Sequence, residues 1–357
     1  MTPLDRLGWS PFFSDQLATE TRSLLVARIV QEQRGAYRVA GDFDGWAEVS
    51  GKLRHSARAT ADFPAVGDWV CLTAPAGSAR ALITRRLERL STVSRKAAGR
   101  TTEEQVVAAN VDTIFLVTSP GEELNPRRIE RYLAVVREAG AVPVVLLNKI
   151  DLSDDADVAI HELRSRLPFV DVLGVSAAQG TAIESLDAYL RPAHTVALLG
   201  SSGVGKSTLV NRLLGEELLK TGATKEGDGK GRHTTTSRNL VELSGGALLI
   251  DTPGMRELQP WVEESAVSEV FEDIAGLADG CRFSDCQHVS EPGCAVLAAI
   301  QGGALSPDRL DHFRQLTLEA AFQERKRDKA AAAEQKRQWK RIHHAQKKLY
   351  RERDRQG

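Results

Sequence analysis

A glycine-rich segment with the composition of a phosphate-binding loop lies near the middle of the chain. It consists of Gly200, Ser201, Ser202, Gly203, Val204, Gly205, Lys206, Ser207 and Thr208. A strand expected at 195–199 precedes it and a helical run expected at 208–214 follows, as such a loop requires. Glycines let backbone N–H groups surround phosphate oxygens, while Lys206 reaches the terminal phosphates and the Ser207 hydroxyl completes the coordination of Mg²⁺. The segment therefore predicts a site for a magnesium-bound nucleotide.

Two upstream motifs indicate which base the nucleotide carries. The first consists of Asn148, Lys149, Ile150 and Asp151. It follows a strand expected at 142–147, and open α/β sheets bind ligands at such strand ends. The Asp151 carboxylate can accept the N1–H and N2–H₂ of guanine, two donors that adenine does not offer in that arrangement. Ser176 and Ala177, after a strand expected at 170–175, add backbone support for the base. Together they predict guanine, although the tetrapeptide alone could be an ordinary turn.

Two further segments could respond to the terminal phosphate. The first consists of Asp251, Thr252, Pro253 and Gly254, after a strand expected at 247–250. Asp251 can hold the Mg²⁺ shell and the Gly254 N–H can meet the γ-phosphate. The second is the run Gly-Arg-His-Thr-Thr-Thr at 231–236, in a Gly- and Lys-rich loop. A threonine there, which we assign as Thr235, could close on Mg²⁺ and let go after hydrolysis. A plain surface loop is the alternative.

These motifs occur in an unusual order, because the base-reading pair precedes the phosphate and switch motifs. Joining the old termini of a domain and opening its chain in a surface loop leaves a packed sheet intact. The order therefore predicts a circularly permuted GTPase domain.

Three of the four cysteines lie in one short window together with a histidine. The four candidate ligands are Cys281, Cys286, His288 and Cys294, whereas Cys71 lies alone elsewhere. Three thiolates and an imidazole suffice for a closed tetrahedral Zn²⁺ site with no open position, so the predicted zinc is structural and not catalytic. Free buried thiols beside a surface histidine are the alternative.

The texture of the chain predicts a multidomain protein. Short β-like runs between turn signals, from Thr21 to Arg100, indicate an all-β barrel of the oligonucleotide-binding type. Apolar runs then alternate with helices expected at 126–139, 155–166 and 182–190, which predicts an α/β domain with a mostly parallel sheet. The predicted divisions are an N-terminal extension at 1–20, an OB-fold-like RNA-binding barrel at 21–100, the permuted GTPase domain at 101–260, a mainly helical zinc-binding domain at 261–320 and a basic C-terminal helix at 321–357.

Charge is distributed unevenly, although the formal net charge is only −1. Residues 21–100 carry a net +7 and residues 321–357 a net +8, whereas residues 101–320 carry −14. Two basic flanks suit a polyanionic partner such as RNA, although either flank alone could be a solvated face. We expect no membrane span, because no apolar run approaches the roughly 20 residues needed, and we expect a cytoplasmic protein because the N-terminus does not resemble a secretion signal.

With these motifs the sequence resembles ribosome small-subunit-dependent GTPase A, the RsgA or YjeQ family. The likeness covers nearly the whole chain and includes the Val-Gly-Asp-Trp-Val run at 66–70 and the Cys-x₄-Cys-x-His-x₅-Cys spacing. The resemblance implies an oligonucleotide-binding barrel, one structural zinc per chain, and GTPase activity stimulated by the small ribosomal subunit, with a role in late subunit maturation. GTP with Mg²⁺, GDP, the subunit and its rRNA are the implied partners, and we expect a monomer.

The position after Asp-x-x-Gly carries Met255, where many GTPases place a glutamine that orients the attacking water. A thioether cannot do this, so hydrolysis should need another group. We nominate His233, beside the switch threonines, as the catalytic candidate alongside Lys206 and Thr235; a surface histidine is the alternative. Two other functions stay open from sequence: a P-loop ATPase or small-molecule kinase, and a non-enzymatic RNA-binding scaffold.

Overall fold

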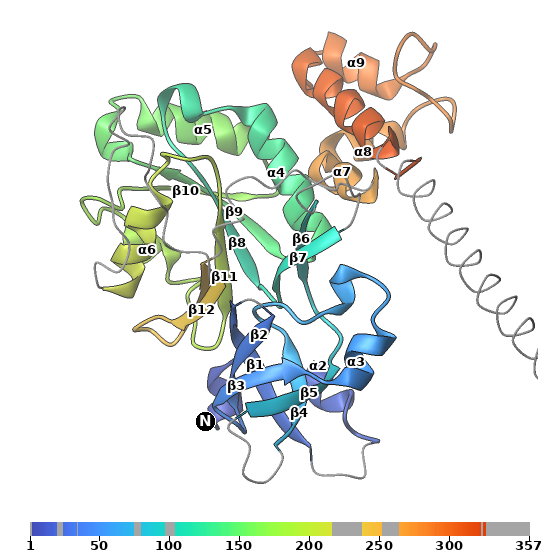
Figure 1. Cartoon of the computed structure of the whole chain (residues 1–357). Helices are drawn as coiled ribbons and strands as arrows, with labels where there is room; N and C mark the ends of the chain where they lie inside the picture. Colours follow the sequence, from blue (N-terminus) through green and yellow to red (C-terminus); the bar gives the residue numbers. More distant parts are fainter. Residues whose placement is uncertain are drawn as a thin grey trace, which may run out of the picture. The chain divides into compact units, whose positions relative to one another are not determined.

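The computed structural model describes residues 2–19, 24–33, 35–74, 80–96, 104–215, 238–251, 264–322 and 324–325. These residues belong to two compact units (Figure 1). The first unit comprises residues 1–97 and 103–260, and the second comprises residues 98–102 and 261–357. The barrel and the α/β domain predicted from the sequence therefore share one unit, and the boundary between them at residue 100 stays a prediction.

Five strands of the first unit form the predicted barrel. They are β1 (Leu25–Gln33), β2 (Ala36–Gly41), β3 (Gly45–Val49), β4 (Trp69–Thr73) and β5 (Arg80–Arg86), with helix α3 (Gly51–Ser56) and the 3-10 turn η1 (Thr60–Asp62) between β3 and β4. Strand β1 pairs with both β2 and β4, and β3 pairs with β5, so the ring closes. Buried and exposed side chains alternate along β2, where Tyr37 and Val39 are buried and Arg38 between them is exposed.

The first residues of the chain pack onto this barrel. Helices α1 (Pro3–Arg6) and α2 (Pro11–Asp15) place Trp9 and Phe13 against Trp69 of β4, with ring centroids 4.8 Å and 5.8 Å from that of Trp69. Phe13 and Trp69 are both buried. The segment predicted as an N-terminal extension thus completes part of the barrel's apolar core.

The α/β part of the first unit is built on a mostly parallel sheet. Its strands are β8 (Thr113–Thr118), β9 (Val142–Asn148), β10 (Asp171–Val175), β11 (Thr195–Leu199), β12 (Arg238–Glu242) and β13 (Leu248–Asp251), in the order β10-β9-β8-β11-β13-β12. Only β12 pairs antiparallel with its neighbour β13. The helices are α4 (Pro126–Glu138), α5 (Ala156–Arg166) and α6 (Lys206–Leu214). The predicted architecture, with a barrel, an α/β domain and a helical C-terminal region, is confirmed.

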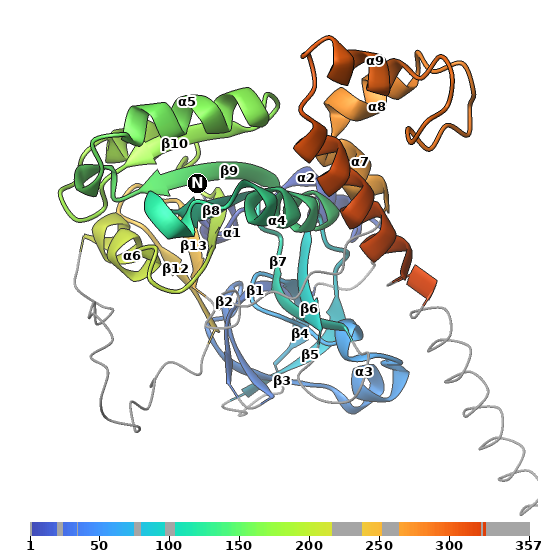
Figure 2. The same cartoon turned by 90° about the horizontal axis from the view of Figure 1, so that it is seen from above.

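Helices cover both faces of this sheet (Figure 2). Leu209, Val210 and Leu213 of α6 belong to one apolar cluster with Phe115 and Val117 of β8 and with alternate residues of the neighbouring strands. Residues of the opposite parity point to the other face, where α4 packs on β8 and β9. Both faces are therefore dry, which explains the near-continuous apolar runs of these strands.

Some elements differ from the expectation. The helix expected at 182–190 is only a 3-10 turn, η4 (Ile183–Leu186), because Ala182 adopts a left-handed conformation with φ 57° before it and Pro192 follows soon after. Two further 3-10 turns are η2 (Gly121–Glu123) and η3 (Ile150–Leu152). Strands β6 (Thr92–Lys96) and β7 (Glu104–Ala109) form a separate antiparallel pair that we had not predicted.

Barrel and α/β sheet are continuous through one pairing. Strand β1 runs antiparallel to β12, with Gln31 opposite Asn239 and Glu32 opposite Arg238. The Arg238 guanidinium also contacts the Glu32 carboxylate at 3.0 Å. The barrel therefore occupies the outer edge of β12, the strand that follows the predicted switch loop.

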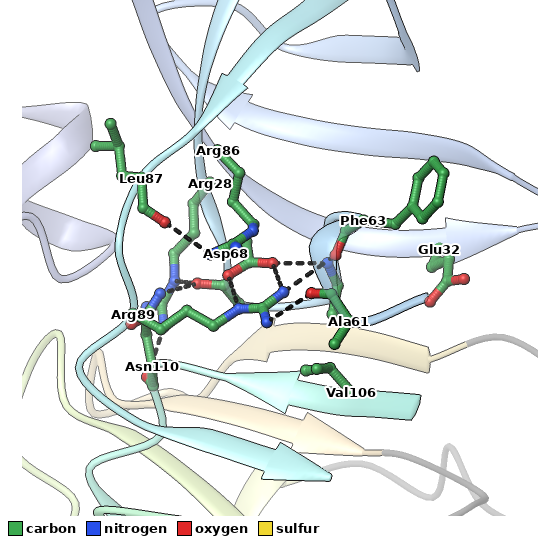
Figure 3. A network of polar contacts seen from close by, with 12 residues as sticks. Arg28, Glu32, Ala61, Phe63, Asp68, Arg86, Leu87, Arg89, Val106 and Asn110 are labelled. Carbon is green, nitrogen blue, oxygen red and sulfur yellow. Dashed lines mark hydrogen bonds and ion pairs between the residues drawn. The ribbon is translucent and has the colours of Figure 1, made fainter. Parts of the chain in front are cut away.

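A buried polar network lies beside this junction (Figure 3). Arg28 is 1% exposed and donates hydrogen bonds to the carbonyls of Gly67 at 3.0 Å and Asn110 at 2.9 Å, and to the Thr195 hydroxyl of β11 at 2.9 Å. Burial lowers the pKa of Arg28 to about 10, against the opposing effect of nearby carboxylates, so its guanidinium stays charged at neutral pH. The barrel residue thus bonds directly to the strand that leads into the phosphate loop.

Asp68 forms a second, adjoining part of the network. Its carboxylate is fully buried and pairs with Arg89 through contacts of 2.7 Å and 2.8 Å. It also accepts the N–H of Ala65 at 2.7 Å. Loss of either Asp68 or Arg89 would leave the other charge buried without a partner, which is strongly destabilising. The pair therefore holds the turn before β4 against Arg89.

The second unit is helical. It contains α7 (Glu264–Val270), α8 (Glu272–Ala278), α9 (Ala295–Gln301) and a helix at 307–322. Phe271 is fully buried, and Arg309 lies 4.7 Å from its ring centroid while bonding to the Asp273 carboxylate at 2.6 Å. The basic tail after residue 325, predicted as helix, lies outside the described residues. Among the residues described, we find no helix with the length and apolarity needed to cross a membrane.

Candidate functional site

The glycine-rich segment connects β11 to α6, the arrangement predicted for a phosphate loop. A Cβ at Gly200 would lie 2.1 Å from the Val117 carbonyl oxygen, and a Cβ at Gly205 would lie 2.3 Å from Nδ2 of Asn148. Gly205 also has φ +94°. Both positions therefore require glycine because of close contacts and, at Gly205, because of backbone conformation as well.

Lys206 points back along the loop from the first turn of α6. Its Nζ donates to the Gly200 carbonyl at 2.7 Å and to the Ser201 carbonyl. Ser207 and Thr208 follow in the same turn. An ammonium and two hydroxyls at a helix N-terminus, where backbone N–H groups lack intrahelical partners, make an environment that favours anions.

Asn148 joins three of the predicted motifs. It is 1% exposed at the end of β9. Its Nδ2 donates to the Val204 carbonyl of the phosphate loop at 2.8 Å, and its Oδ1 accepts the Ala177 N–H at 2.9 Å. The neighbouring Lys149 adopts φ +64° and donates from Nζ to the Gly203 carbonyl at 2.7 Å. The segments predicted to meet base and phosphate are thus adjacent, as their positions at the ends of parallel strands require.

Asp151 lies in η3, three residues after Asn148, and is exposed. Ser176 and Ala177 are buried at the end of β10, the strand that pairs parallel with β9. A tight turn follows, in which the Gly180 N–H donates to the Ser176 carbonyl at 2.7 Å. Asp151 and this turn thus follow two neighbouring parallel strands, as the prediction that both contact a purine base requires.

Asp251 ends β13, which runs parallel to β11, so its side chain lies at the same sheet edge as the phosphate loop. It is half-buried. The other predicted switch residues lie outside the described residues; they are Thr252, Pro253, Gly254, Met255, His233 and Thr235.

Arg212 also contacts the turn at residues 176–180, and the sequence did not predict it. From α6 its guanidinium donates to the carbonyls of Ala177 at 3.1 Å and Ala178 at 2.7 Å. Nothing in the sequence distinguished it from an ordinary exposed helical arginine, because its partners lie 34 and 35 residues upstream.

The predicted zinc ligands converge in the second unit. The ligand atoms of Cys281, Cys286, His288 and Cys294 all lie within 4.8 Å of one another. The Cys281 and Cys294 sulfurs are 3.8 Å apart, and His288 Nδ1 lies 3.6 Å and 3.4 Å from them. Zinc bonds to sulfur and nitrogen in tetrahedral geometry imply separations of about 3.5–3.8 Å. The cluster therefore fits a structural zinc, while Cys71 is buried in the barrel core.

Other side chains fix the loop that carries His288. The Glu291 carboxylate accepts the N–H groups of Gln287 at 2.9 Å, Val289 at 2.7 Å and Ser290 at 2.9 Å. These backbone bonds lower the pKa of Glu291 to about 2, so it is ionised at neutral pH. Arg314, from the helix at 307–322, donates to the His288 carbonyl. The ligand loop is thus held by contacts that do not involve the metal.

Comparison with known proteins identifies close relatives. A family model described as RsgA GTPase matches residues 86–261. The small ribosomal subunit biogenesis GTPase RsgA of Opitutus terrae is 45% identical over 355 residues, covering 96% of this chain and 97% of that protein. The protein of the same name from Methanosarcina acetivorans is 46% identical over 280 residues, covering 78% of this chain and 75% of that protein.

Solved structures agree with these relatives. YjeQ from Thermotoga maritima matches with a TM-score of 0.64 and 26% identity, covering 84% of this chain and 99% of that one. YloQ, described as a circularly permuted GTPase, matches with a TM-score of 0.61 and 23% identity over 85% of this chain and 97% of that one, and supports the fold.

Proposed function

The chain belongs to the RsgA GTPase family and is a GTP hydrolase of small ribosomal subunit biogenesis, and on this premise we propose that it hydrolyses GTP at the sheet edge where the three motifs meet. The alternatives of an ATPase, a small-molecule kinase or an RNA-binding scaffold are thereby set aside. We further propose that the subunit stimulates the reaction and that the protein acts late in subunit maturation.

The observation that supports this site best is the pair of Asn148 hydrogen bonds. One side chain holds Val204 of the phosphate loop and Ala177 of the base loop, at 2.8 Å and 2.9 Å. A nucleotide spans the same two segments, so the site is organised before the ligand arrives. Such preorganisation reduces the ordering cost of binding.

In this proposal the remaining residues divide between base and phosphates. Asp151 accepts the guanine N–H groups, and Ser176 and Ala177 support the base through their backbone. Lys206 binds the terminal phosphates within the cradle of backbone N–H groups, whose residues are Gly200, Ser201, Ser202, Gly203, Val204, Gly205, Ser207 and Thr208. The Lys206 ammonium would exchange its present carbonyl partners for phosphate oxygens.

Magnesium would be held by the Ser207 hydroxyl and, through its shell, by Asp251. Both offer oxygen ligands, which Mg²⁺ prefers, and they lie at the ends of one helix and one neighbouring strand. When bound, the ion neutralises charge that develops on the phosphates. Gly254 would meet the γ-phosphate, and Thr235 would close on the ion in the GTP state.

His233 remains our proposed group for positioning the attacking water, because Met255 occupies the position where many GTPases carry glutamine. Replacement of His233 by Ala should reduce subunit-stimulated turnover without preventing GDP binding. Unchanged turnover would remove His233 from the mechanism.

We propose that the basic barrel and the basic tail bind the rRNA of the small subunit, and that the protein acts as a monomer in the cytoplasm, where it would meet that subunit. The zinc cluster would stabilise the second unit and take no part in the reaction, since its four protein ligands leave no open position. Because the barrel and the tail would bind rRNA phosphates through basic side chains, RNA affinity should fall steeply as the salt concentration rises.

A steady-state assay tests the proposal. Phosphate release from GTP is measured with and without purified small subunits, with ATP as the control substrate. The proposal requires turnover of GTP over ATP and a marked increase on adding subunits. Equal turnover of the two nucleotides would refute guanine recognition, and an absence of stimulation would refute the proposed regulation.

A further inference from the structure

Arg212 connects the phosphate-loop helix to the turn that we assign to the base. It lies on α6, whose first residue is Lys206. Its Nε and Nη2 donate to two consecutive carbonyls, those of Ala177 and Ala178. A Cβ at Gly180 would lie 3.5 Å from the guanidinium carbon, so the guanidinium packs across the turn from its beginning to its end.

We propose that Arg212 is a positioning residue for guanine recognition, which holds the backbone of residues 176–180 in the conformation that receives the base. The inference rests on the function proposed above, because it requires the base to lie between Asp151 and this turn. Arg212 itself would not touch the nucleotide.

The hydrogen bonds of the turn leave one backbone donor available. The N–H of Ala177 donates to Asn148 Oδ1 at 2.9 Å, that of Gln179 to Ser176 Oγ at 3.1 Å, and that of Gly180 to the Ser176 carbonyl at 2.7 Å. In the part of the chain that the structure describes, no acceptor contacts the Ala178 N–H. The turn therefore presents this single N–H to a ligand.

Arg212 determines the direction of that donor. A trans peptide unit is planar, so the N–H of Ala178 points opposite to the carbonyl of Ala177. Because Arg212 holds that carbonyl, it directs the Ala178 N–H away from α6. Asn148 holds the peptide unit between Ser176 and Ala177, and Arg212 holds the next two units through the carbonyls of Ala177 and Ala178. Three consecutive peptide units are therefore fixed.

A fixed donor at this place discriminates between purines. Guanine carries the O6 carbonyl, a hydrogen-bond acceptor, whereas adenine carries an amino group at the same position, a donor. An N–H facing this position favours guanine and opposes adenine. This selection would act together with that of Asp151, which faces a different edge of the base.

Arginine suits this task better than lysine does. Its planar fork presents several N–H groups in fixed directions and can hold two neighbouring carbonyls at once, whereas the lysine ammonium is a single flexible donor centre. The conservative variant should therefore restore the position only in part.

Arg164 provides a matched control. It is also an exposed arginine on a helix, α5, and its Nε and Nη2 donate to one backbone carbonyl, that of Val172, at 3.2 Å and 2.9 Å. Val172 lies in β10, the strand that leads to the same turn. Loss of Arg164 removes comparable bonds without releasing residues 176–180.

The test measures equilibrium binding of GDP and ADP to the full chain, by competition with a ribose-labelled fluorescent GDP, for the wild type and for Arg212→Met, Arg212→Lys and Arg164→Met. Arg212→Met should raise the Kd of GDP by about threefold to tenfold, the loss of one or two modest hydrogen bonds. The Kd of ADP should stay at its wild-type value, and the loss should fall on KM for GTP rather than on kcat. The Kd of GDP for Arg212→Lys should lie between those of the wild type and Arg212→Met. Arg164→Met should keep the wild-type ratio of the Kd values for GDP and ADP.

The outcomes separate this inference from the function on which it rests. Three outcomes would overturn the role of Arg212: equal changes in the Kd of GDP and ADP in Arg212→Met, no change in either Kd, or the same loss of GDP affinity in Arg164→Met. In each case, a preference of the wild type for GDP over ADP would leave the proposed function standing. A wild type without preference for GDP would refute the proposed function itself.

Discussion

The Nδ2 of Asn148 donates to the carbonyl oxygen of Val204 at 2.8 Å, and this bond ties the end of β9 to the phosphate loop. The two residues are 56 positions apart in the chain. Because Asn148 is buried, its amide must be satisfied within the protein. The bond therefore joins the two segments that we propose to contact the base and the phosphates.

Asn148→Asp should weaken nucleotide binding. Aspartate keeps an oxygen for the Ala177 N–H but places a second oxygen against the Val204 carbonyl, which costs about 1–3 kcal/mol as an unsatisfied buried acceptor pair. We expect a Kd for GDP at least about tenfold higher by calorimetric titration. Asn125→Asp is the control, since Asn125 caps α4 by accepting the Arg128 N–H at 3.1 Å. Wild-type affinity in Asn148→Asp would show that the joint is dispensable.

Asp151→Asn should change the preferred base. The amide loses one of the two acceptors for guanine and gains a donor that matches the C2 carbonyl of xanthine. GDP affinity should fall by about tenfold to 100-fold, the loss of hydrogen bonds to a charged group, while affinity for xanthosine diphosphate rises. Asp154→Asn, an exposed neighbour, should leave both unchanged. If GDP still outcompetes the xanthine nucleotide, Asp151 does not read the base.

Gly67→Ala should destabilise the first unit severely. A Cβ at this position would lie 2.0 Å from the Ala109 carbonyl oxygen, and φ is +93°. Overpacking and the left-handed conformation together cost about 3–5 kcal/mol. Gly121→Ala is the matched control because its φ is +82° with nothing within 4 Å, so it should cost about 1–2 kcal/mol. Urea unfolding curves compare them, and equal losses would contradict the steric argument.

Glu291→Gln should loosen the zinc loop. A glutamine cannot accept all three N–H groups that the carboxylate accepts, because one of its two terminal atoms is a donor. Loss of supporting contacts around a metal ligand typically costs about tenfold to 100-fold in metal affinity. Competition with a chromogenic chelator measures this. Asp285→Asn, an exposed acid of the same loop, should retain zinc as the wild type does. Identical zinc affinity in both variants would argue against the role of Glu291.

Removal of zinc should unfold the second unit while the first unit stays folded. The cluster joins the segment after α8 to the start of α9, where the Cys294 sulfur accepts the Leu297 N–H at 3.4 Å. In small units of this kind, the free energy of zinc binding contributes directly to the free energy of folding. A chelator should therefore lower the helical circular dichroism, and readdition of zinc should restore it. Undiminished helicity after verified zinc loss would rule out a structural metal.

The local parts of the site could be predicted because each motif follows a strand directly. Gly200 to Ser207, Asn148 to Asp151 and Ser176–Ala177 all lie at strand ends that apolar runs reveal, and parallel strands bring such ends to one edge. Short spacing likewise predicted that Cys281, Cys286, His288 and Cys294 form one cluster. Short β-like runs separated by turn signals sufficed to predict the barrel, and buried and exposed residues alternate along β2 and β5.

The remaining features depend on contacts between distant residues. Arg28 is one arginine among many in the sequence, and only the fold places it, fully buried, against Thr195, 167 residues away. The pairing of β1 with β12 and the reach of Arg212 to Ala177 are of the same kind. The helix expected at 182–190 was wrong because a left-handed Ala182 and the nearby Pro192 limit it to one 3-10 turn.

The pairing of Glu32 with Arg238 bears on how this protein can be dissected. A truncated version that begins after the barrel would leave the outer side of β12 with unpaired N–H and C=O groups. Exposed edge strands of this kind pair with strands of other chains. The truncation would also remove Arg28, which donates hydrogen bonds to the Thr195 hydroxyl and the Asn110 carbonyl. Attempts to study the nucleotide site by itself should therefore yield aggregates, whereas deletion of residues 264–357 leaves β1 and β13, the two strands paired with β12, in place.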